Sequence, residues 1–469
     1  MKKLNRETIS SLPKRPVKIV QFGEGNFLRG FVDWMVDILN ERTDFNGNVQ
    51  IVQPLPNGMA EPINQQQGLY HVVLEGLEKG EKVQNSRLIT AVEGVLNPYE
   101  AYKDFLSLGE NPGLRFIVSN TTEAGIVFDS QDARHTSVPK TFPGKLTALL
   151  YHRFRFFKGT PPGELYILPC ELIDTNGTIL LECVEKYIEL WSLGQDFKHW
   201  LQNHVYFYNT LVDRIVPGFP RDTINEVQGK LGYEDQLVVK AEPFHLWVIE
   251  GAPQIEQELD VKKAGLNVVF TQDLSPYRTR KVRILNGAHT AMVPVGYLKG
   301  FTEVRAVAEN EKMAAFLNQI IFEEIIPTLD MPKAELESYA DEVLDRFGNP
   351  FIKHRLLDIS LNSISKFKVR VLPSILKYME TFKEVPEGLI TAFYYLILFY
   401  KGEFEENEIP LKDNETYISF FKTVWNQEDE EGFLRNILSN EALWGENLCD
   451  RKLLVEALEL KRKQFPLTE

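Results

Sequence analysis

Residues 17–34 read VKIVQFGEGNFLRGFVDW, an apolar run followed at once by a glycine loop and a helical pattern. The run Val17–Gly23 has the continuous apolar character of a buried strand. From Phe27 to Glu41 the apolar residues recur at helical spacing. A strand, a glycine-rich turn and a helix in this order are typical of the first βαβ unit of a dinucleotide-binding fold.

The loop matches the dinucleotide fingerprint G-x-G-x-x-G incompletely. Gly23 and Gly25 occupy the first two glycine positions, Leu28 stands at the third, and the next glycine is Gly30. In the fingerprint the first glycine allows a tight turn, and the second lets the backbone approach the pyrophosphate. An isolated G-x-G would equally be an ordinary turn, but its place directly after the first strand favours the nucleotide loop.

The end of the second predicted strand, Asn48–Leu55, lacks an expected side chain. A simple NAD-binding fold carries a carboxylate here, which binds the ribose hydroxyls. This chain has Gln53 instead, and no arginine is adjacent to receive the 2′-phosphate of NADP. We therefore expect NAD(H) as the cofactor.

Strand-like and helix-like segments alternate through the first half of the chain. Further strands are predicted at 114–120 and 164–172, and a further helix at 178–191. This alternation implies a parallel, doubly wound sheet. From about Tyr277 helical patterns replace the strands, at 311–329, 333–347, 374–382 and 440–465. The sequence predicts an α/β protein with a Rossmann-type NAD-binding domain over residues 1–275 and an all-α substrate-binding and catalytic domain over residues 276–469.

Composition excludes several classes of protein. The net charge of −14 argues against a nucleic-acid partner, because phosphate binding needs clustered lysine and arginine. The longest apolar run, Gly388–Tyr400, is shorter than the ~20 residues of a membrane span and predicts a buried helix. No signal-peptide pattern or metal-ligand spacing of cysteine and histidine is visible. We expect a cytoplasmic protein that binds no membrane and needs no metal.

The stretch YRTRKVRILNGAHTAMVP (277–294) contains Lys281, Asn286 and His289. On an α-helix Asn286 would lie about 140° and His289 about 80° around the axis from Lys281, within one side of the helix. A lysine can exchange a proton with a carbonyl oxygen, an asparagine amide can stabilise charge on that oxygen, and a histidine can orient a hydroxyl. The alternative is a solvated lysine, a helix-breaking Asn-Gly pair and a core histidine.

Seven separated stretches support the catalytic interpretation: FGEGNFLRGF (22–31), QQGLYHVVLEG (66–76), SNTTEAG (119–125), PCELIDTNG (169–177), NTLVDRIVP (209–217), KVRILNGAHT (281–290) and RFGNPFIKH (346–354). Together and in this order they resemble the mannitol dehydrogenase family of polyol-specific long-chain dehydrogenases. The resemblance implies metal-independent hydride transfer with NAD(H), a Rossmann-type domain followed by a helical domain, and Lys281 as acid/base with Asn286 and His289 beside it.

Within the family the stretches look more like members that act on sugar acids than like the mannitol dehydrogenases. This implies reduction of D-tagaturonate to D-altronate in hexuronate breakdown, so the expected partner is a small keto-uronate or aldonate. D-Fructuronate or mannitol are the alternative substrates, and a dinucleotide-binding sensor without catalysis is the alternative from another class. The oligomeric state is left open, and a monomer is compatible with the sequence.

The resemblance leaves the substrate-binding residues open. Leu172 stands where the mannitol dehydrogenases carry a second oxyanion asparagine, so that either Asn176 takes part or Asn286 acts alone. A cation should face the substrate carboxylate, and the candidates are His354, Arg355, Lys366 and Arg370. The candidates for binding the cofactor are Phe22, Gly23, Gly25, Asn26, Phe27, Thr121, Thr122 and Glu123. Glu123 is also a candidate proton relay or a helix N-terminal carboxylate.

Overall fold

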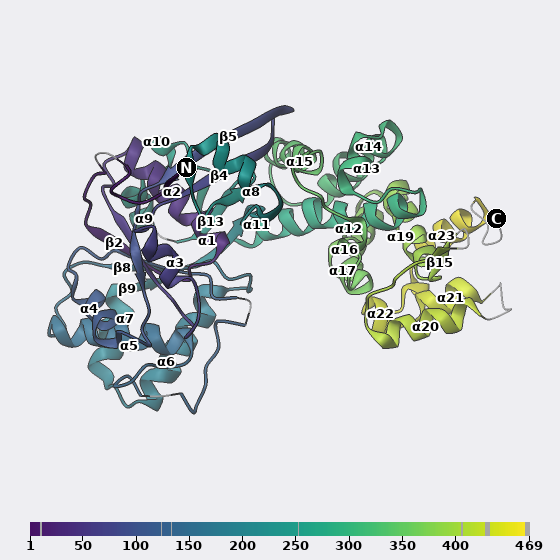
Figure 1. Cartoon of the computed structure of the whole chain (residues 1–469). Coiled ribbons are helices and arrows are strands. Elements are labelled where there is room, and N and C mark those ends of the chain that lie inside the picture. The colour runs from purple at the N-terminus through teal and green to yellow at the C-terminus, as the bar shows by residue number, and fades with distance from the viewer. Residues whose placement is uncertain are drawn as a thin grey trace. The chain divides into compact units, whose positions relative to one another are not determined.

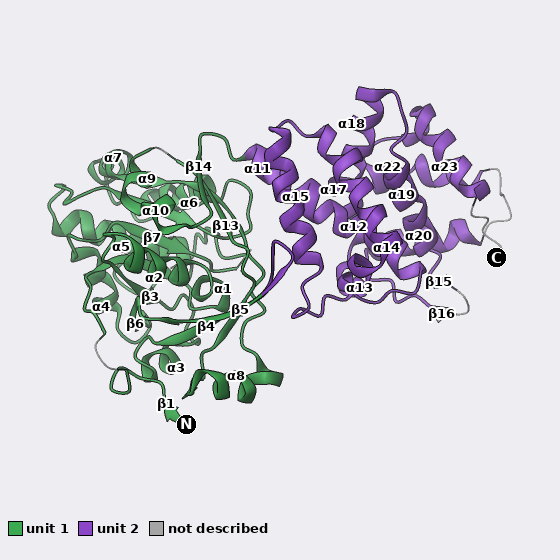
Figure 2. Ribbon diagram, turned by 90° about the horizontal axis from the view of Figure 1, so that it is seen from above, with its two compact units in different colours: residues 1–75, 83–274 green, residues 76–82, 275–469 purple. Residues whose placement is uncertain are grey.

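The computed structural model describes residues 1–9, 12–122, 124–132, 134–251, 253–404, 407–426 and 432–464 of the chain. The chain divides into two compact units, residues 1–75 with 83–274 and residues 76–82 with 275–469 (Figure 2). Residues 76–82, which the sequence-based division left in the first domain, are the tip of a hairpin that groups with the second unit. There the Gly80 N–H donates to the Asp345 carboxylate over 3.2 Å.

The first unit is built on a six-stranded sheet whose neighbouring strands are all parallel (Figure 1). Its strand order is β6 (Val92–Leu96), β3 (Asn48–Val52), β2 (Val17–Phe22), β7 (Phe116–Ser119), β8 (Leu165–Pro169) and β9 (Val205–Phe207). Numbered within this sheet alone, the order is 3-2-1-4-5-6, which is that of the dinucleotide-binding fold. The predicted Rossmann-type sheet is confirmed, and the chain reverses its direction of winding between β2 and β7.

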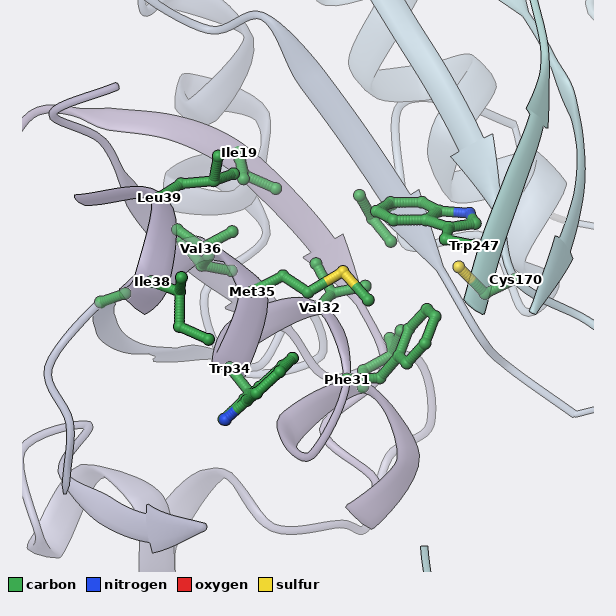
Figure 3. Packing of buried hydrophobic residues seen from close by; sticks show 14 of the residues in the cluster. Ile19, Phe31, Val32, Trp34, Met35, Val36, Ile38, Leu39, Cys170 and Trp247 are labelled. Atoms are coloured by element: carbon green, nitrogen blue, oxygen red, sulfur yellow. The ribbon is translucent and has the colours of Figure 1, made fainter. Parts of the chain in front are cut away.

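Both faces of this sheet are covered, which explains the continuous apolar runs of its strands. Along β2, Ile19 belongs to one buried cluster and its neighbour Val20 to the other. The first cluster lies against α2 (Val32–Arg42), and Figure 3 shows Ile19 close to Val36 and Leu39 of that helix. The second cluster is formed with α5 (Phe142–Phe156), α6 (Asn176–Leu190) and α7 (Gln195–His204).

The helix predicted from Phe27 to Glu41 is interrupted. A single turn, α1 (Asn26–Arg29), is followed by Gly30 and Phe31 before α2 begins. A Cβ on Gly30 would lie 3.0 Å from the side chain of Val239 and 3.2 Å from that of Val216. The chain therefore approaches its neighbours closely at the break, and a larger residue there would require the two valine side chains to shift by a few tenths of an ångström.

The first unit also contains strands that periodicity did not predict. The hairpin β4 (Tyr70–Glu78) and β5 (Glu81–Ile89) forms a small sheet with β12 (Val239–Ala241), and β10 (Asn209–Asp213), β13 (Leu246–Glu250) and β14 (Val268–Thr271) form another. Its remaining elements are β1 (Lys2–Lys3), β11 (Tyr233–Glu234), α3 (Ala60–Gln65), α4 (Tyr102–Ser107), η1 (Leu108–Glu110), η2 (Arg221–Thr223), α8 (Ile224–Leu231), α9 (Pro253–Leu259) and α10 (Val261–Ala264).

In its described residues the second unit is helical, as predicted, apart from the hairpin tip 76–82 and the short pair β15 (Glu403–Phe404) and β16 (Asn407–Glu408). Its helices are α11 (Ser275–Arg280), α12 (Gly287–Leu298), α13 (Val304–Glu309), α14 (Glu311–Asn318), α15 (Lys333–Phe347), α16 (Leu356–Ile359), α17 (Ser363–Arg370), α18 (Leu372–Phe382), α19 (Glu387–Phe399), α20 (Glu415–Trp425), α21 (Phe433–Leu438), α22 (Glu441–Trp444) and α23 (Lys452–Gln464). Two π-helical segments, η3 (Lys281–Asn286) and η4 (Gln319–Ile325), and two 3₁₀ turns, η5 (Ile326–Thr328) and η6 (Leu448–Asp450), complete it.

The longest apolar run of the sequence forms α19, a buried helix as expected. Its first turn is held by the buried carboxylate of Glu324, which accepts the N–H groups of Gly388 and Leu389 over 2.7 Å each. No helix within the described ranges is long and apolar enough to cross a membrane.

Candidate active site

The two loop glycines meet different requirements. Gly23 has φ +121°, and a Cβ there would lie 2.8 Å from the carbonyl oxygen of Asn120, so the backbone of the turn requires glycine. Gly25 has an ordinary φ of −68°, and a Cβ there would have no neighbour within 4 Å. Gly25 is exposed, so the loop presents bare backbone at the carboxyl end of β2. Exposed backbone without a side chain is what the close approach of a dinucleotide pyrophosphate requires at this position.

The conformation of the loop is stabilised by hydrogen bonds from Arg29, which is almost completely buried. Its guanidinium donates to the carbonyl oxygens of Glu24 (3.0 Å) and Leu237 (2.7 Å) and to Asn26 Oδ1 (2.7 Å). Arg29 is thus a structural residue of the loop.

A buried carboxyl lies close behind the same loop. The Tyr70 hydroxyl donates to Asp33 over 2.7 Å, and burial raises the pKa of the Asp33 carboxyl to about 7. Sequence reasoning missed this network because its members are scattered through the chain.

The predicted cofactor residues around the loop differ in what they expose. The Phe22 side chain is fully buried and packs on Phe105 and Phe142, so only its backbone belongs to the loop. Asn26 is exposed, and Phe27 stacks on Phe31 with ring centroids 5.0 Å apart. Of this predicted set, Gly25 and Asn26 are the residues best placed to meet a ligand.

The carboxyl ends of β7 and β8 are joined by the buried carboxylate of Glu171. It accepts the Thr121 N–H, the Thr121 hydroxyl and the Ser119 hydroxyl, each over 2.9 Å. Burial raises the pKa of this carboxyl. Thr122 has φ +97°, which is rare for a β-branched residue. Predicted residues Thr121 and Thr122 therefore lie at the switch point beside Gly23, whereas Glu123 lies outside the described residues.

Asn176 is corrected from a candidate substrate-binding residue to a structural one. Its side-chain nitrogen donates to the carbonyl oxygens of Pro169, Glu171 and Thr210 over 3.0–3.1 Å. Its side-chain oxygen accepts the N–H groups of Gly177 and Thr210 over 2.9 Å each. The amide is buried and its hydrogen-bonding capacity is used, so it ties β8 to β10 and has nothing left for a substrate.

In the second unit Lys281 begins the π-helical segment η3 and Asn286 ends it. The α-helical estimate of their separation is therefore wrong. A π-helix closes its hydrogen bonds from residue i to i+5, so residues five apart lie about one turn above each other. Lys281 and Asn286 are the first and sixth residues of this segment, which aligns them more closely than an α-helix would.

His289 follows on α12, next to a second histidine. Its ring lies 4.3 Å from that of Phe347 and 5.1 Å from that of His354, measured between centroids. Burial lowers the pKa of His354, which favours the neutral form of its imidazole. His354 therefore belongs to the surroundings of His289, and its burial disfavours a positive charge there.

The other three predicted cations have distinct environments. Arg355 is exposed at a bridge with Glu303. The Lys366 ammonium donates to the Ile359 carbonyl oxygen over 2.8 Å. Arg370 Nη1 lies 3.5 Å from the Thr290 hydroxyl, which itself donates to the carbonyl oxygen of Asn286 over 2.8 Å. Arg370 is thus the candidate cation that is connected to Asn286, through the Thr290 hydroxyl.

Within the described part of the chain, no group of three or more histidine, cysteine, aspartate or glutamate side chains could hold a metal ion.

Comparison with known proteins gives a consistent result for both units. Residues 17–263 match the family "Mannitol dehydrogenase Rossmann domain" and residues 273–465 match "Mannitol dehydrogenase C-terminal domain". The altronate oxidoreductase of Bacillus subtilis (strain 168) is 47% identical over 451 residues, covering 96% of this chain and 92% of the relative. That of Phocaeicola vulgatus is 45% identical over 450 residues, covering 96% and 94%.

Two solved structures share the fold over nearly the whole chain. A substrate-free D-sorbitol dehydrogenase has a TM-score of 0.81 at 23% identity and covers 98% of this chain and 97% of its own. The mannitol 2-dehydrogenase of Pseudomonas fluorescens, in a ternary complex with NAD and D-mannitol, has a TM-score of 0.66 at 21% identity, with coverage of 99% and 97%.

Proposed function

Because the chain belongs to the mannitol dehydrogenase family, and is an NAD-dependent oxidoreductase acting on CH–OH groups, we propose that it interconverts D-tagaturonate and D-altronate. The observation that carries this proposal is the identity of 45–47% with altronate oxidoreductases over 96% of the chain. Hexuronate breakdown is the process in which such a reaction would serve.

The chemistry proposed for the second unit uses three side chains. When bound, NADH supplies a hydride for the keto carbon. The Lys281 ammonium gives a proton to the carbonyl oxygen, and the Asn286 amide donates a hydrogen bond to that oxygen as charge develops. His289 orients a substrate hydroxyl. The alignment of Lys281 and Asn286 along η3 supports this assignment, because both groups must reach one oxygen atom.

We assign the substrate carboxylate to Arg370. This guanidinium is partly buried, and burial alone accounts for the lowering of its pKa. No carboxylate pairs with it in the described ranges, although a partly buried charge is stabilised by an opposite one. It contacts Thr290, whose hydroxyl is bonded to Asn286, so an anion on Arg370 would lie about one helical turn from the carbonyl-polarising amide. A planar guanidinium also suits bidentate binding of a carboxylate.

Kinetics with a panel of substrates tests the proposal. NADH oxidation should have its highest kcat/KM with D-tagaturonate, a lower value with D-fructuronate and the lowest with D-fructose. A preference for fructose would overturn the assignment to a sugar acid. Absence of turnover with every ketose and keto-uronate would instead favour a dinucleotide-binding sensor.

Arg370→Gln tests the carboxylate site separately. Hydrogen bonds to charged groups contribute about 1.5–3 kcal/mol, so kcat/KM for the keto-uronate should fall by roughly 10- to 100-fold. Turnover of an uncharged ketose should hardly change. The matched control is Arg355→Gln, which removes an exposed arginine from the same region. An equal fall in kcat/KM for the charged and the uncharged substrate would show that Arg370 supports the fold and does not bind the carboxylate.

A further inference from the structure

The carboxylate missing from the end of the second Rossmann strand has a replacement in the glycine loop. In the fold's usual arrangement an acid at this strand end binds the ribose hydroxyls of NAD. Here the strand is β3, and it is followed by Gln53. We propose that Glu24, between the two loop glycines, is the acid that binds the adenosine ribose and makes the enzyme selective for NAD over NADP.

Gln53 itself is not available for the ribose. It is 2% exposed, and its side-chain nitrogen donates to the carbonyl oxygens of Leu55 (2.8 Å) and Pro56 (3.1 Å). Its side-chain oxygen accepts the Ala60 N–H over 3.0 Å. The Gln53 amide therefore shapes the loop after β3 and leaves the recognition of hydroxyls to another group.

Glu24 reaches that loop from the neighbouring strand. The loop glycine Gly23 donates its N–H to the Val52 carbonyl oxygen over 3.1 Å, which brings the start of the glycine loop to the end of β3. From there Glu24 Oε1 extends to the Met59 N–H at 3.4 Å. A Cβ on Gly58 would lie 2.1 Å from the same oxygen and 2.7 Å from the Gln53 side-chain oxygen. The carboxylate thus occupies the place beside Gln53 where the ribose acid is expected.

The bonding state of Glu24 leaves room for a ligand. The backbone N–H groups of Met59, at 3.4 Å, and of Glu24 itself donate to this carboxylate, which has about four acceptor positions. The side chain is partly exposed, and burial raises the pKa of its carboxyl. Two ribose hydroxyls would donate to this carboxylate, and they would offset part of its burial cost.

The surroundings of Glu24 also disfavour a 2′-phosphate. No lysine or arginine occurs between residues 43 and 78, which include the whole loop after β3. The guanidinium that acts electrostatically on the Glu24 carboxyl is that of Arg29, which is buried and bonded to three loop and neighbouring oxygens. A phosphate dianion beside Glu24 would therefore face a like charge and no lysine or arginine from this loop.

Binding of NADH and NADPH to the enzyme without substrate tests this proposal, by titration of nicotinamide fluorescence. The wild type should bind NADH at least ~10-fold more tightly than NADPH, since a charge-assisted pair is gained with one and a repulsion met with the other. Glu24→Gln, which retains an acceptor for Met59, should raise the Kd of NADH about tenfold and leave that of NADPH unchanged or lower. Glu24→Asp should still reject NADPH.

Two controls make the outcome decisive. Glu61→Gln removes an exposed carboxylate at the start of α3 and should leave both dissociation constants unchanged. An unchanged ratio of the two constants in Glu24→Gln, or equal weakening of both cofactors, would overturn the proposal and leave Glu24 as a cap for Met59. A wild type that binds both cofactors equally would overturn it as well. None of these measurements depends on which sugar acid is the substrate.

Discussion

Alanine substitutions at Gly23 and Gly25 should separate the folding of the loop from its binding of cofactor. Gly23→Ala places a side chain at φ +121° with its Cβ 2.8 Å from a backbone carbonyl oxygen. Backbone strain of about 1–3 kcal/mol and a steric cost of similar size give a loss of roughly 2–6 kcal/mol. At about 2–4 °C per kcal/mol for a domain of this size, the Tm of the first unit should fall by roughly 4–24 °C.

Gly25→Ala should behave in the opposite way. Its backbone has φ −68° and its Cβ meets nothing within 4 Å, so stability should change by no more than about 1 kcal/mol. The same methyl group would stand where the backbone approaches the pyrophosphate, and the Kd of NADH should rise by about tenfold or more. Thermal unfolding and fluorescence titration of both variants check this. A wild-type Kd in Gly25→Ala, or a wild-type Tm in Gly23→Ala, would refute the reasoning.

Three further substitutions test other parts of the structure. Lys281→Ala should lower kcat by about 10²- to 10⁴-fold without changing the Kd of NADH, and near-normal turnover would contradict its role as acid/base. Asn176→Ala should destabilise the protein by roughly 2–4 kcal/mol in urea unfolding, because it leaves buried backbone groups unpaired, while a loss of kcat alone would contradict the structural role. Asp33→Asn should remove a pH dependence of the free energy of unfolding. Between about pH 4 and pH 7 the Asp33 carboxyl is ionised in the unfolded chain but protonated in the folded one. As the pH rises through this range, the free energy of unfolding of the wild type should therefore fall by about 1.4 kcal/mol per pH unit relative to that of the variant. If urea unfolding gives both proteins the same change in free energy of unfolding between pH 5 and pH 8, this explanation is excluded.

The parallel sheet could be predicted because both of its faces are buried. Strands such as β2 and β8 are then continuous apolar runs that stand out from the helices around them. The hairpin of β4 and β5 escaped prediction because β5 is largely polar and exposed, and therefore carries no apolar period. The break at Gly30 was equally invisible, since it depends on contacts with Val216 and Val239, nearly two hundred residues away or more.

The placement of the candidate site residues could be predicted where it depends on the local sequence. Lys281, Asn286 and His289 lie on one continuous helical segment, as their spacing implied, although the segment begins with a π-helix that no local pattern revealed. Asn176 was misjudged because its amide is used by carbonyl groups of three separate segments. Glu171 could have been noticed as a carboxylate directly after a strand, at the edge where ligands of such sheets bind.

The π-helical segment has a consequence for insertions and deletions. A turn closed from i to i+5 contains one residue more than an α-helical turn, so η3 is an α-helix that has accommodated an extra residue. Deleting one residue between Lys281 and Asn286 would let the segment relax to an uninterrupted α-helix, a change that α11 and α12 could tolerate as secondary structure. Lys281 and Asn286 would then be four residues apart on an α-helix, about 40° around its axis, so the two side chains would stay aligned. Relaxation to an α-helix without a deletion would instead place them about 140° apart. The extra residue and the π-helical turn therefore belong together, and a natural relative with a regular α-helix here is expected to be one residue shorter between the lysine and the asparagine.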